Sequence, residues 1–174
     1  ADAGQWSYVP QGNFNGDDLL GVTVTDDLGG TATQDILITV NPVNDNPTGG
    51  VRIQGSFRED EMLTSRISLT DPDGPTTLVI HYQWKRAVSA NAIFTNISGA
   101  TGDSYTLDDD DVGQVVRLVA SYTDNGGVVE TATSAATLAV SNVNDLPTGE
   151  IQLEGIATED DTLVANTQAI ADVD

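Results

Sequence analysis

Cysteine is absent from the chain and basic residues are scarce, and each shortage excludes a class of site or partner. Without a thiol among its 174 residues, the chain can form neither disulfides nor thiolate metal sites. Six Lys and Arg stand against 27 Asp and Glu, so the formal net charge is -21. A chain this acidic is not expected to bind nucleic acid or an anionic membrane. Its natural partners are cations.

Catalytic motifs and membrane segments are also missing from the sequence. No apolar run approaches the roughly 20 residues of a transmembrane helix, so direct membrane insertion is not expected. The sequence contains no G-x-S-x-G nucleophile elbow, no cysteine nucleophile and no phosphate-binding loop, and His81 is its single histidine. One histidine also serves zinc and copper poorly. The sequence therefore predicts a protein that is not an enzyme.

An internal repeat organises the chain. The stretch NPVNDNPTG at residues 41–49 returns as SNVNDLPTG at 141–149, with the same offset on both sides of each stretch. Similarity at a fixed, domain-sized period indicates a tandem array. The repeat predicts three parts: the C-terminal part of one repeat at 1–46, a complete repeat at 47–146, and the N-terminal part of the next at 147–174.

Short strands dominate the pattern within the repeat. In TLVIHYQWK (77–85), Leu78, Ile80, Tyr82 and Trp84 occupy every second position, as in a half-buried strand, and Tyr82 and Trp84 are expected in the core. Gly and Pro interrupt the chain about every ten residues, which favours an all-β, Greek-key β-sandwich. Seven strands are expected, at 51–56, 62–69, 77–85, 92–98, 104–107, 114–122 and 128–140.

Acidic residues fall in the loops that this topology would gather at its two ends. Two loops are expected at the end where the chain leaves the sandwich, beside the linker, and two at the end where it enters. The residues predicted at the exit are Glu59, Asp60, Asp108, Asp110, Asn144 and Asp145. Those predicted at the entry are Asn44, Asp45, Asn46, Asp71, Asp73 and Asp124.

Like charges gathered at a joint repel one another unless a divalent cation collects them. Ca²⁺ takes six to eight oxygen ligands from carboxylates, amides and backbone carbonyls, so calcium is the predicted cofactor on ligand chemistry. The alternative is that the acids are only solvated surface. Asp111-Val112-Gly113 in particular has the form of a structural turn before a strand, in which Asp111 hydrogen-bonds the turn.

Six stretches carry a resemblance to a known kind of protein. They are VNDNPTG, VNDLPTG, YQWKR, ISGATGDSYTLDDDDVGQVV, SYTDNGG and GQWSYVPQGNFNGDDLLGVTVTDDLGG. Together they resemble the cadherin-like and bacterial immunoglobulin-like tandem repeats of large secreted bacterial adhesins, including RTX-type adhesins. The resemblance implies a location outside the cell, at the bacterial surface, and a cadherin- or immunoglobulin-like form of the sandwich.

The cadherin-type joint implies roles for particular residues here. Asn44, Asp45 and Asn46 would be linker ligands, as would Asn144 and Asp145, and Asp71 and Asp73 would be the Asp-x-Asp pair after the first linker. After the second linker the matching pair would be Asp172 and Asp174. This chain departs from the pattern at Pro42 and Asn142, which replace the leading Asp of each linker, and at Leu146, which replaces the second Asn, so one side-chain ligand is lost at each joint.

Two functions from different classes are consistent with these features. The first is a calcium-rigidified extracellular repeat, a spacer or adhesion module whose partners are calcium ions and the neighbouring repeats of the same chain. The second is a module that binds a polysaccharide or a protein. The incomplete repeats at the two ends would also expose unpaired strand edges, which favours self-association.

Overall fold

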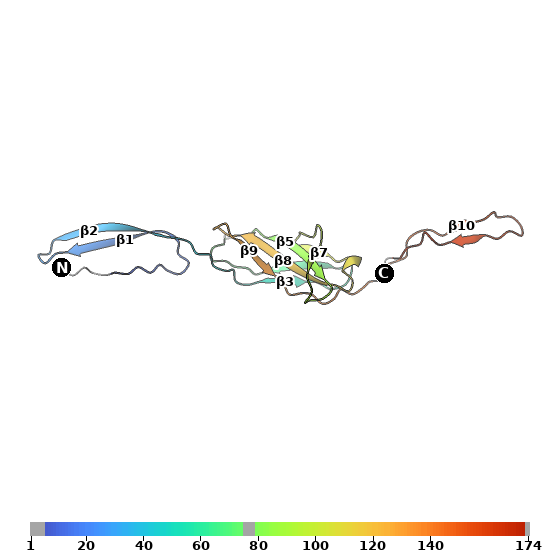
Figure 1. Cartoon of the computed structure of the whole chain (residues 1–174), viewed down its shortest axis with the longest axis horizontal. Coiled ribbons are helices and arrows are strands. Elements are labelled where there is room, and N and C mark those ends of the chain that lie inside the picture. The colour runs from blue at the N-terminus through green and yellow to red at the C-terminus, as the bar shows by residue number, and fades with distance from the viewer. Residues whose placement is uncertain (1–5, 75–78, 173–174) are drawn as a thin grey trace. The chain divides into compact units, whose positions relative to one another are not determined.

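The computed structural model describes residues 6–74 and 79–172, and the chain folds as an all-β protein. Its strands are β1 (Gly16–Thr25), β2 (Thr31–Val40), β3 (Val51–Gln54), β4 (Met62–Ile67), β5 (His81–Ala87), β6 (Thr95–Asn96), β7 (Ser104–Thr106), β8 (Val115–Thr123), β9 (Val129–Thr133), β10 (Gln152–Glu154) and β11 (Val164–Asn166) (Figure 1). One short 3₁₀ helix, η1 (Asp109–Asp111), precedes β8. In the described residues, no helix has the length and apolar character needed to cross a membrane.

Contacts divide the chain into two compact units. The first contains residues 1–49, 69–79 and 122–130, and the second contains 50–68, 80–121 and 131–174. Each acidic end predicted above falls within one unit: the entry residues lie in the first, and Glu59, Asp109 and Asp145 lie in the second. The division into 1–46, 47–146 and 147–174 stays a prediction from the sequence repeat.

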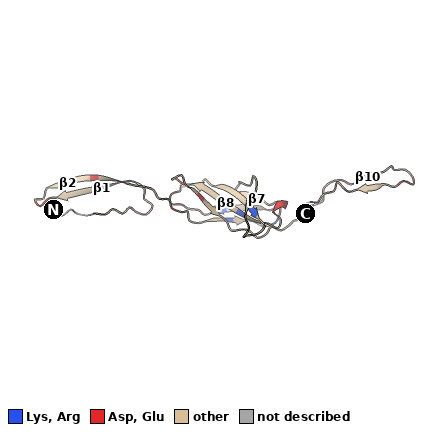
Figure 2. Ribbon diagram, viewed as in Figure 1, with Lys and Arg blue, Asp and Glu red and all other residues tan. Residues whose placement is uncertain are grey.

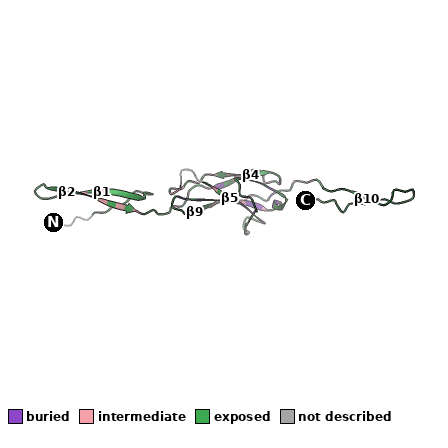
Figure 3. Cartoon of the chain, turned by 90° about the horizontal axis from the view of Figure 1, so that it is seen from above, coloured by how far each residue is buried: buried purple, intermediate pink, exposed green. Residues whose placement is uncertain are grey.

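The first unit contains a long antiparallel hairpin. Strands β1 and β2 pair along their whole length, from Gly16 opposite Val40 to Thr25 opposite Thr31. The Asp26 carboxylate closes the turn by accepting the N–H groups of Leu28 and Gly30. No described residue before Val51 is buried, and neither strand of this hairpin contains a buried residue (Figure 3). The hairpin thus has strand pairing without a core of its own.

A two-sheet sandwich provides the core. One sheet has the order β3-β4-β7 and the other β6-β5-β8-β9. Trp84 of β5 is fully buried, and its ring centroid lies 5.8 Å from that of Tyr105 on β7, which joins the two sheets. Its indole N–H donates to the Gly102 carbonyl, 3.0 Å away, so the ring is buried without an unsatisfied donor. Leu63, Leu118 and Tyr122 complete the centre of the core.

Alternation along β8 follows the expected period of two. Val116, Leu118, Ala120 and Tyr122 are all buried, whereas the residues between them are half-buried. Strand β8 pairs with β5 in an antiparallel register, from His81 opposite Ser121 to Ala87 opposite Val115. Leu118 lies opposite Trp84 in this register. The prediction of Trp84 in the core is confirmed, but Tyr82 is only half-buried.

Six of the seven expected strands are shorter than predicted, and three of them differ the most from the prediction. The strand expected at 77–85 begins at His81, with residues 77 and 78 outside the described residues, and the one expected at 92–98 is reduced to β6. The last strand, expected at 128–140, ends at Thr133. From there on, the hydroxyls of Ser134 and Thr137 accept the N–H groups of Leu118 and Val116 in place of backbone carbonyls. Because side-chain hydroxyls take the place of backbone acceptors here, the backbone hydrogen-bond ladder that the apolar pattern predicted is interrupted.

The sequence repeat is matched by a repeat in backbone geometry. Asp60 and Asp160 both adopt left-handed conformations, with φ of 64° and 68°. Thr48 pairs with Thr70, as Thr148 pairs with Ala171 one repeat later. Gly55 has φ of 140°, and a Cβ there would lie 2.8 Å from the Met62 carbonyl oxygen, so only glycine fits the position. The hairpin β10–β11 therefore reproduces the β3–β4 hairpin of the preceding repeat.

Candidate metal centres

Three carboxylates converge at the exit end of the sandwich. Glu59, Asp109 and Asp145 each place one oxygen within 4.8 Å of the others. Glu59 follows β3, Asp109 begins η1, and Asp145 belongs to the linker. Glu59 is only 2% exposed, whereas Asp145 is half-buried and Asp109 is exposed. We call these three residues the exit cluster.

The turn before β4 fixes the position of Glu59. Its N–H donates to the Ser141 carbonyl (3.0 Å), and the next residue, Asp60, donates its N–H to the Leu107 carbonyl (3.1 Å). The left-handed conformation of Asp60 reverses the chain between these two bonds. The Glu59 carboxylate in turn accepts the Val143 N–H at 2.9 Å. The turn and the start of the linker are thus tied together on both sides of Glu59.

Opposing influences set the pKa of Glu59. The hydrogen bond from the Val143 N–H lowers it, but contact with the Asp109 carboxylate, burial, and the negative charges of Asp109 and Asp145 together outweigh that bond. The net result is a pKa raised above the ordinary value for glutamate. A carboxylate that faces other carboxylates in this way favours binding of a proton or a cation.

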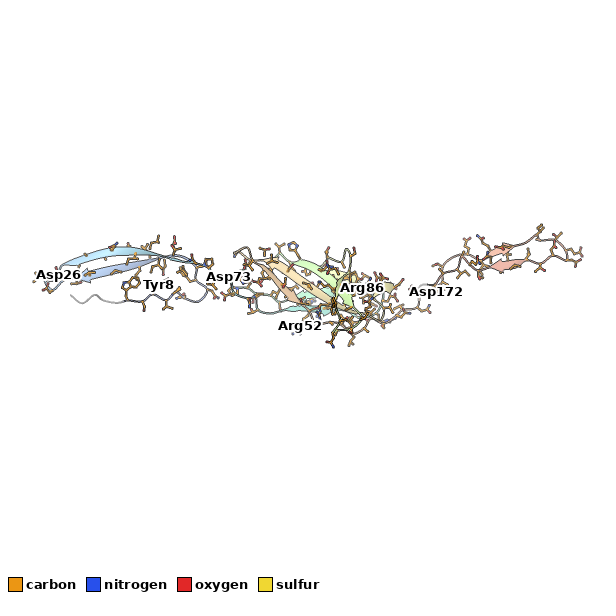
Figure 4. The ribbon with its side chains drawn as sticks, viewed as in Figure 1. Tyr8, Asp26, Arg52, Asp73, Arg86 and Asp172 are labelled. Atoms are coloured by element: carbon orange, nitrogen blue, oxygen red, sulfur yellow. The ribbon has the colours of Figure 1, made fainter. Side chains whose placement is uncertain are left out.

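The remaining aspartates of the run 108–111 contact one arginine. Arg86 lies on β5 (Figure 4). Its guanidinium reaches Asp110 at 2.9 Å, Asp111 at 3.2 Å and Asp108 at 3.5 Å. Asp111 is fully buried and also accepts the Tyr105 hydroxyl (2.6 Å) and the Asp108 N–H (3.2 Å). The predicted structural turn at Asp111 is confirmed. Burial, followed by the hydrogen bond to Asp111, raises the pKa of Tyr105.

At the entry end, Asp71 is engaged by donors of the protein itself. It accepts the Tyr122 hydroxyl at 2.5 Å and the Asp73 N–H at 2.9 Å, so each of its two oxygens has a partner. Burial is the main cause of a raised pKa at Tyr122, and the bond to Asp71 adds to it. Asp71 therefore positions the loop, and each of its oxygens already accepts one hydrogen bond.

The linker at the entry end is held by two direct hydrogen bonds. The Asp45 N–H donates to the Asp73 carboxylate at 2.6 Å, and the Asn44 amide donates to Glu130 at 2.9 Å. Both bonds lie within the first unit. They join the linker to the loop that contains Asp73 and to Glu130 of β9, and we call them the entry clasp.

One carboxylate oxygen at the entry end has no partner. Asp124 is 7% exposed; its Oδ1 accepts the Val128 N–H at 2.7 Å, but its Oδ2 is buried without a hydrogen bond. Asp124 lines a hollow of about 440 Å³ together with Asn44 and Asp73. A buried charged oxygen without a donor is costly, which marks this position as one that a cation or an ordered water would satisfy.

The other residues predicted as metal ligands are placed less closely. Asn46 and Asp60 are exposed, and the Asn144 amide donates to the Asp145 carbonyl at 2.7 Å. Asp172 is exposed and has an interaction partner, and Asp174 lies outside the described residues. Sequence reasoning omitted Asp109, which joins the exit cluster, and named Asp108 and Asp110, which contact Arg86. A run of four identical residues gave no signal of which one would face the linker.

All six basic residues lie between positions 52 and 117 (Figure 2). Residues 1–51 and 118–174 contain acids and no Lys or Arg at all. Both linkers are therefore acidic segments without a basic residue of their own. A mobile cation is the simplest counter-charge for such a segment.

Comparison with known families identifies a bacterial immunoglobulin-like domain in part of the chain. An all-β sandwich with acidic ends is a repeat module in form, and a family model described as a bacterial Ig domain matches residues 1–39. The match covers β1 and nearly all of β2 and supports a bacterial immunoglobulin-like domain there. No curated protein matches the chain significantly. Domains of this kind commonly occur in surface or extracellular proteins, and they are typically not catalytic.

Proposed function

We propose that the chain is a spacer segment of a secreted bacterial surface adhesin, in which calcium stiffens the joints between repeats. The observation that carries this proposal is the exit cluster, where carboxylates of Glu59, Asp109 and Asp145 lie within 4.8 Å of one another. One residue comes from each of two loops of the sandwich and one from the linker. A cation held by all three would fix the linker to the sandwich.

Charge is the reason why this cluster calls for a cation. Three carboxylates within 4.8 Å of one another form three repelling pairs, and this repulsion weakens as solvent and salt screen the charges. A divalent cation turns this repulsion into attraction. Calcium accepts carboxylate, amide and backbone carbonyl oxygens in flexible geometry, and the linker offers all three kinds.

A second, weaker cation position is proposed at the entry end. Its support is the buried Asp124 Oδ2 without a partner, in a hollow that Asp73 and Asn44 also line. The entry clasp already satisfies one oxygen of Asp73, so fewer ligand atoms remain than at the exit. We therefore expect the exit cluster to bind calcium more tightly than the entry hollow.

Calorimetric titration with calcium tests the proposal. Wild-type protein should bind calcium with a Kd of roughly 10⁻⁴–10⁻³ M, the range of extracellular modules. Asp109→Asn should remove the tighter event, because it takes one charge from the exit cluster. Asp103→Asn is the matched control, since Asp103 is an exposed aspartate outside the cluster. Equal binding by wild type and Asp109→Asn would refute calcium at this position.

Stability in calcium and in EDTA provides the second readout. A ligand that binds only the folded state adds about 2.7 kcal/mol at a hundredfold excess over its Kd. Urea unfolding of the wild type should show this gain in calcium, and Asp109→Asn should lose most of it. If the wild type unfolds at the same urea concentration in both conditions, calcium does not act at these joints.

A further inference from the structure

Arg86 divides the four consecutive aspartates of the exit end into two groups. Its guanidinium contacts Asp108, Asp110 and Asp111, at distances from 2.9 to 3.5 Å. Asp109 is the one member of the run without an ion pair to Arg86 in the described structure, and it is the member that faces Glu59 and Asp145. The run is thus divided between three aspartates that share the single positive charge of Arg86 and one that faces the linker.

The local backbone explains how adjacent residues can face in different directions. Asp109–Asp111 form a 3₁₀ turn that follows Asp108. Asp108 is extended and precedes the helix, but its carboxylate and that of Asp111 both reach the same terminal nitrogen of Arg86, so the two lie on one side. Asp109 lies a third of a turn away from Asp111. Any rotation of η1 would exchange which aspartate faces the linker.

Several bonds oppose a rotation of η1. Arg86 contributes bonds to aspartates on two different faces of this short helix. It binds Asp111, which is fully buried and is also held by Tyr105, and it binds the exposed Asp110 with its other terminal nitrogen. Arginine can hold two carboxylates at once because its planar guanidinium carries several donors in a rigid fork. Lysine carries the same charge on one flexible ammonium and lacks this geometry.

We propose that Arg86 is the positioning residue of the exit cluster: by binding Asp108, Asp110 and Asp111 it holds η1 in the rotation that directs Asp109 towards Glu59 and Asp145. This inference rests on the proposed calcium site. Arg86 also limits that site to three carboxylates, because the other three acids of the turn region are paired with it. The expected capacity of the exit end is therefore one divalent cation.

The sign of one mutational effect separates positioning from simple electrostatics. Arg86 carries a positive charge, so its removal should strengthen cation binding nearby if charge were its only influence. A positioning role predicts the reverse, because loss of the arginine frees η1 and leaves Asp109 without a fixed direction. Arg86→Lys sharpens the contrast, since the charge is retained and only the fork geometry is lost.

The experiment measures the calcium Kd of the exit cluster by calorimetry. Binding at the exit cluster is identified as the binding event that Asp109→Asn removes. Arg86→Gln should weaken this event about tenfold or more, which corresponds to about 1.4 kcal/mol, and Arg86→Lys should weaken it in the same direction. Arg52→Gln is the charge-matched control, because this substitution removes the same positive charge from a different place. Arg52 lies on β3, opposite Arg66. This control should leave the calcium Kd of the exit cluster unchanged or lower it slightly.

Each outcome decides between distinct accounts. Calcium binding by Arg86→Gln as tight as or tighter than that of the wild type would overturn the positioning role while leaving the calcium site intact. A wild type that binds no calcium at the exit would sink the calcium site and this inference with it. Urea unfolding in EDTA shows whether Arg86→Gln is folded. If it is not, Arg86→Lys decides: an unchanged Kd overturns the inference, and a weakened one supports it.

Discussion

The entry and exit ends of the repeat contain similar numbers of acids but satisfy them in different ways. At the entry, protein donors reach the carboxylates: the Tyr122 hydroxyl binds Asp71 and the Asp45 N–H binds Asp73. At the exit, Glu59, Asp109 and Asp145 face one another. We therefore propose that the arrangement of hydrogen-bond donors around each acid, and not the number of acids in a loop, determines where a cation binds.

Both ends also contain a tyrosine that donates to an aspartate; Tyr122 is buried and Tyr105 is half-buried. Tyr122 binds Asp71 at the entry, and Tyr105 binds Asp111 at the exit. Each bond fixes the base of an acidic loop to the core of the sandwich. The aspartates so engaged provide structure, and their neighbours along the chain remain for the linker. In each loop, one aspartate is thus held in place by a tyrosine of the sandwich.

The largest expected effect concerns the buried aspartate of the exit loop. Asp111→Ala removes a fully buried carboxylate that pairs with Arg86, Tyr105 and the Asp108 N–H. Breaking a buried pair from one side costs about 3 kcal/mol or more. Urea unfolding in EDTA should show this loss, independent of calcium. Asp110→Ala is the control, because its carboxylate is 76% exposed and its pair with Arg86 contributes about 1 kcal/mol at most.

At the entry, loss of the Tyr122 hydroxyl should have the next largest effect. Tyr122→Phe removes a hydrogen bond to a charged group, which contributes about 1.5–3 kcal/mol. Unfolding in urea at neutral pH measures this loss, with Tyr82→Phe as a control on a half-buried tyrosine. An unchanged unfolding midpoint in Tyr122→Phe would show that Asp71 does not depend on this donor.

The same variant has a distinct alkaline signature. Burial and the bond to Asp71 raise the pKa of Tyr122, so the folded state keeps the phenol proton that the unfolded state loses above about pH 10. Stability contributed by this group is therefore present below that pH and is lost as the pH rises further. Tyr122→Phe should show a shallower alkaline decline than the wild type. An identical decline would contradict the raised pKa.

A smaller effect is expected from the entry clasp. Asp73→Asn replaces a charge-assisted acceptor for the Asp45 N–H by a neutral one, which weakens the bond by about 1 kcal/mol. Hydrogen exchange should show the Asp45 amide about fivefold less protected in the variant. Asp27→Asn, an exposed aspartate in the β1–β2 turn region, is the control. Unchanged protection at Asp45 would contradict the clasp.

The sequence predicted the architecture better than it predicted the details of the sites. Alternation of apolar residues identified β5 and β8 and their core residues Trp84 and Leu118, because a strand with one buried face must follow a period of two. The same pattern extended the last strand beyond its actual end at Thr133. It contains no sign that the hydroxyls of Ser134 and Thr137 replace backbone acceptors there. Local side-chain bonds of this kind leave no periodic signal.

For the sites, loop assignment was enough to bring Glu59 near Asp145 but not to choose among the four aspartates. That choice depends on the rotation of a 3₁₀ turn and on an arginine 22 positions earlier than Asp108 in the chain, at the end of a strand. The sequence contained a clue: Arg86 is one of only six basic residues. Arg86 forms ion pairs with Asp108, Asp110 and Asp111, so the position of this one basic residue indicates which aspartates of the run are paired within the fold.

Order at the exit joint tests the central claim most directly. Because the chain has no cysteine, Ser98→Cys and Thr158→Cys introduce exactly two labelling sites, both exposed, one on the sandwich and one beyond the exit linker. Spin labels at these cysteines report the distribution of distances across the joint. The account predicts a broad distribution in EDTA that narrows in calcium, and a distribution that stays broad in calcium when Asp109→Asn is added. Distributions of equal width in calcium and in EDTA for the otherwise wild-type chain would contradict calcium-dependent stiffening.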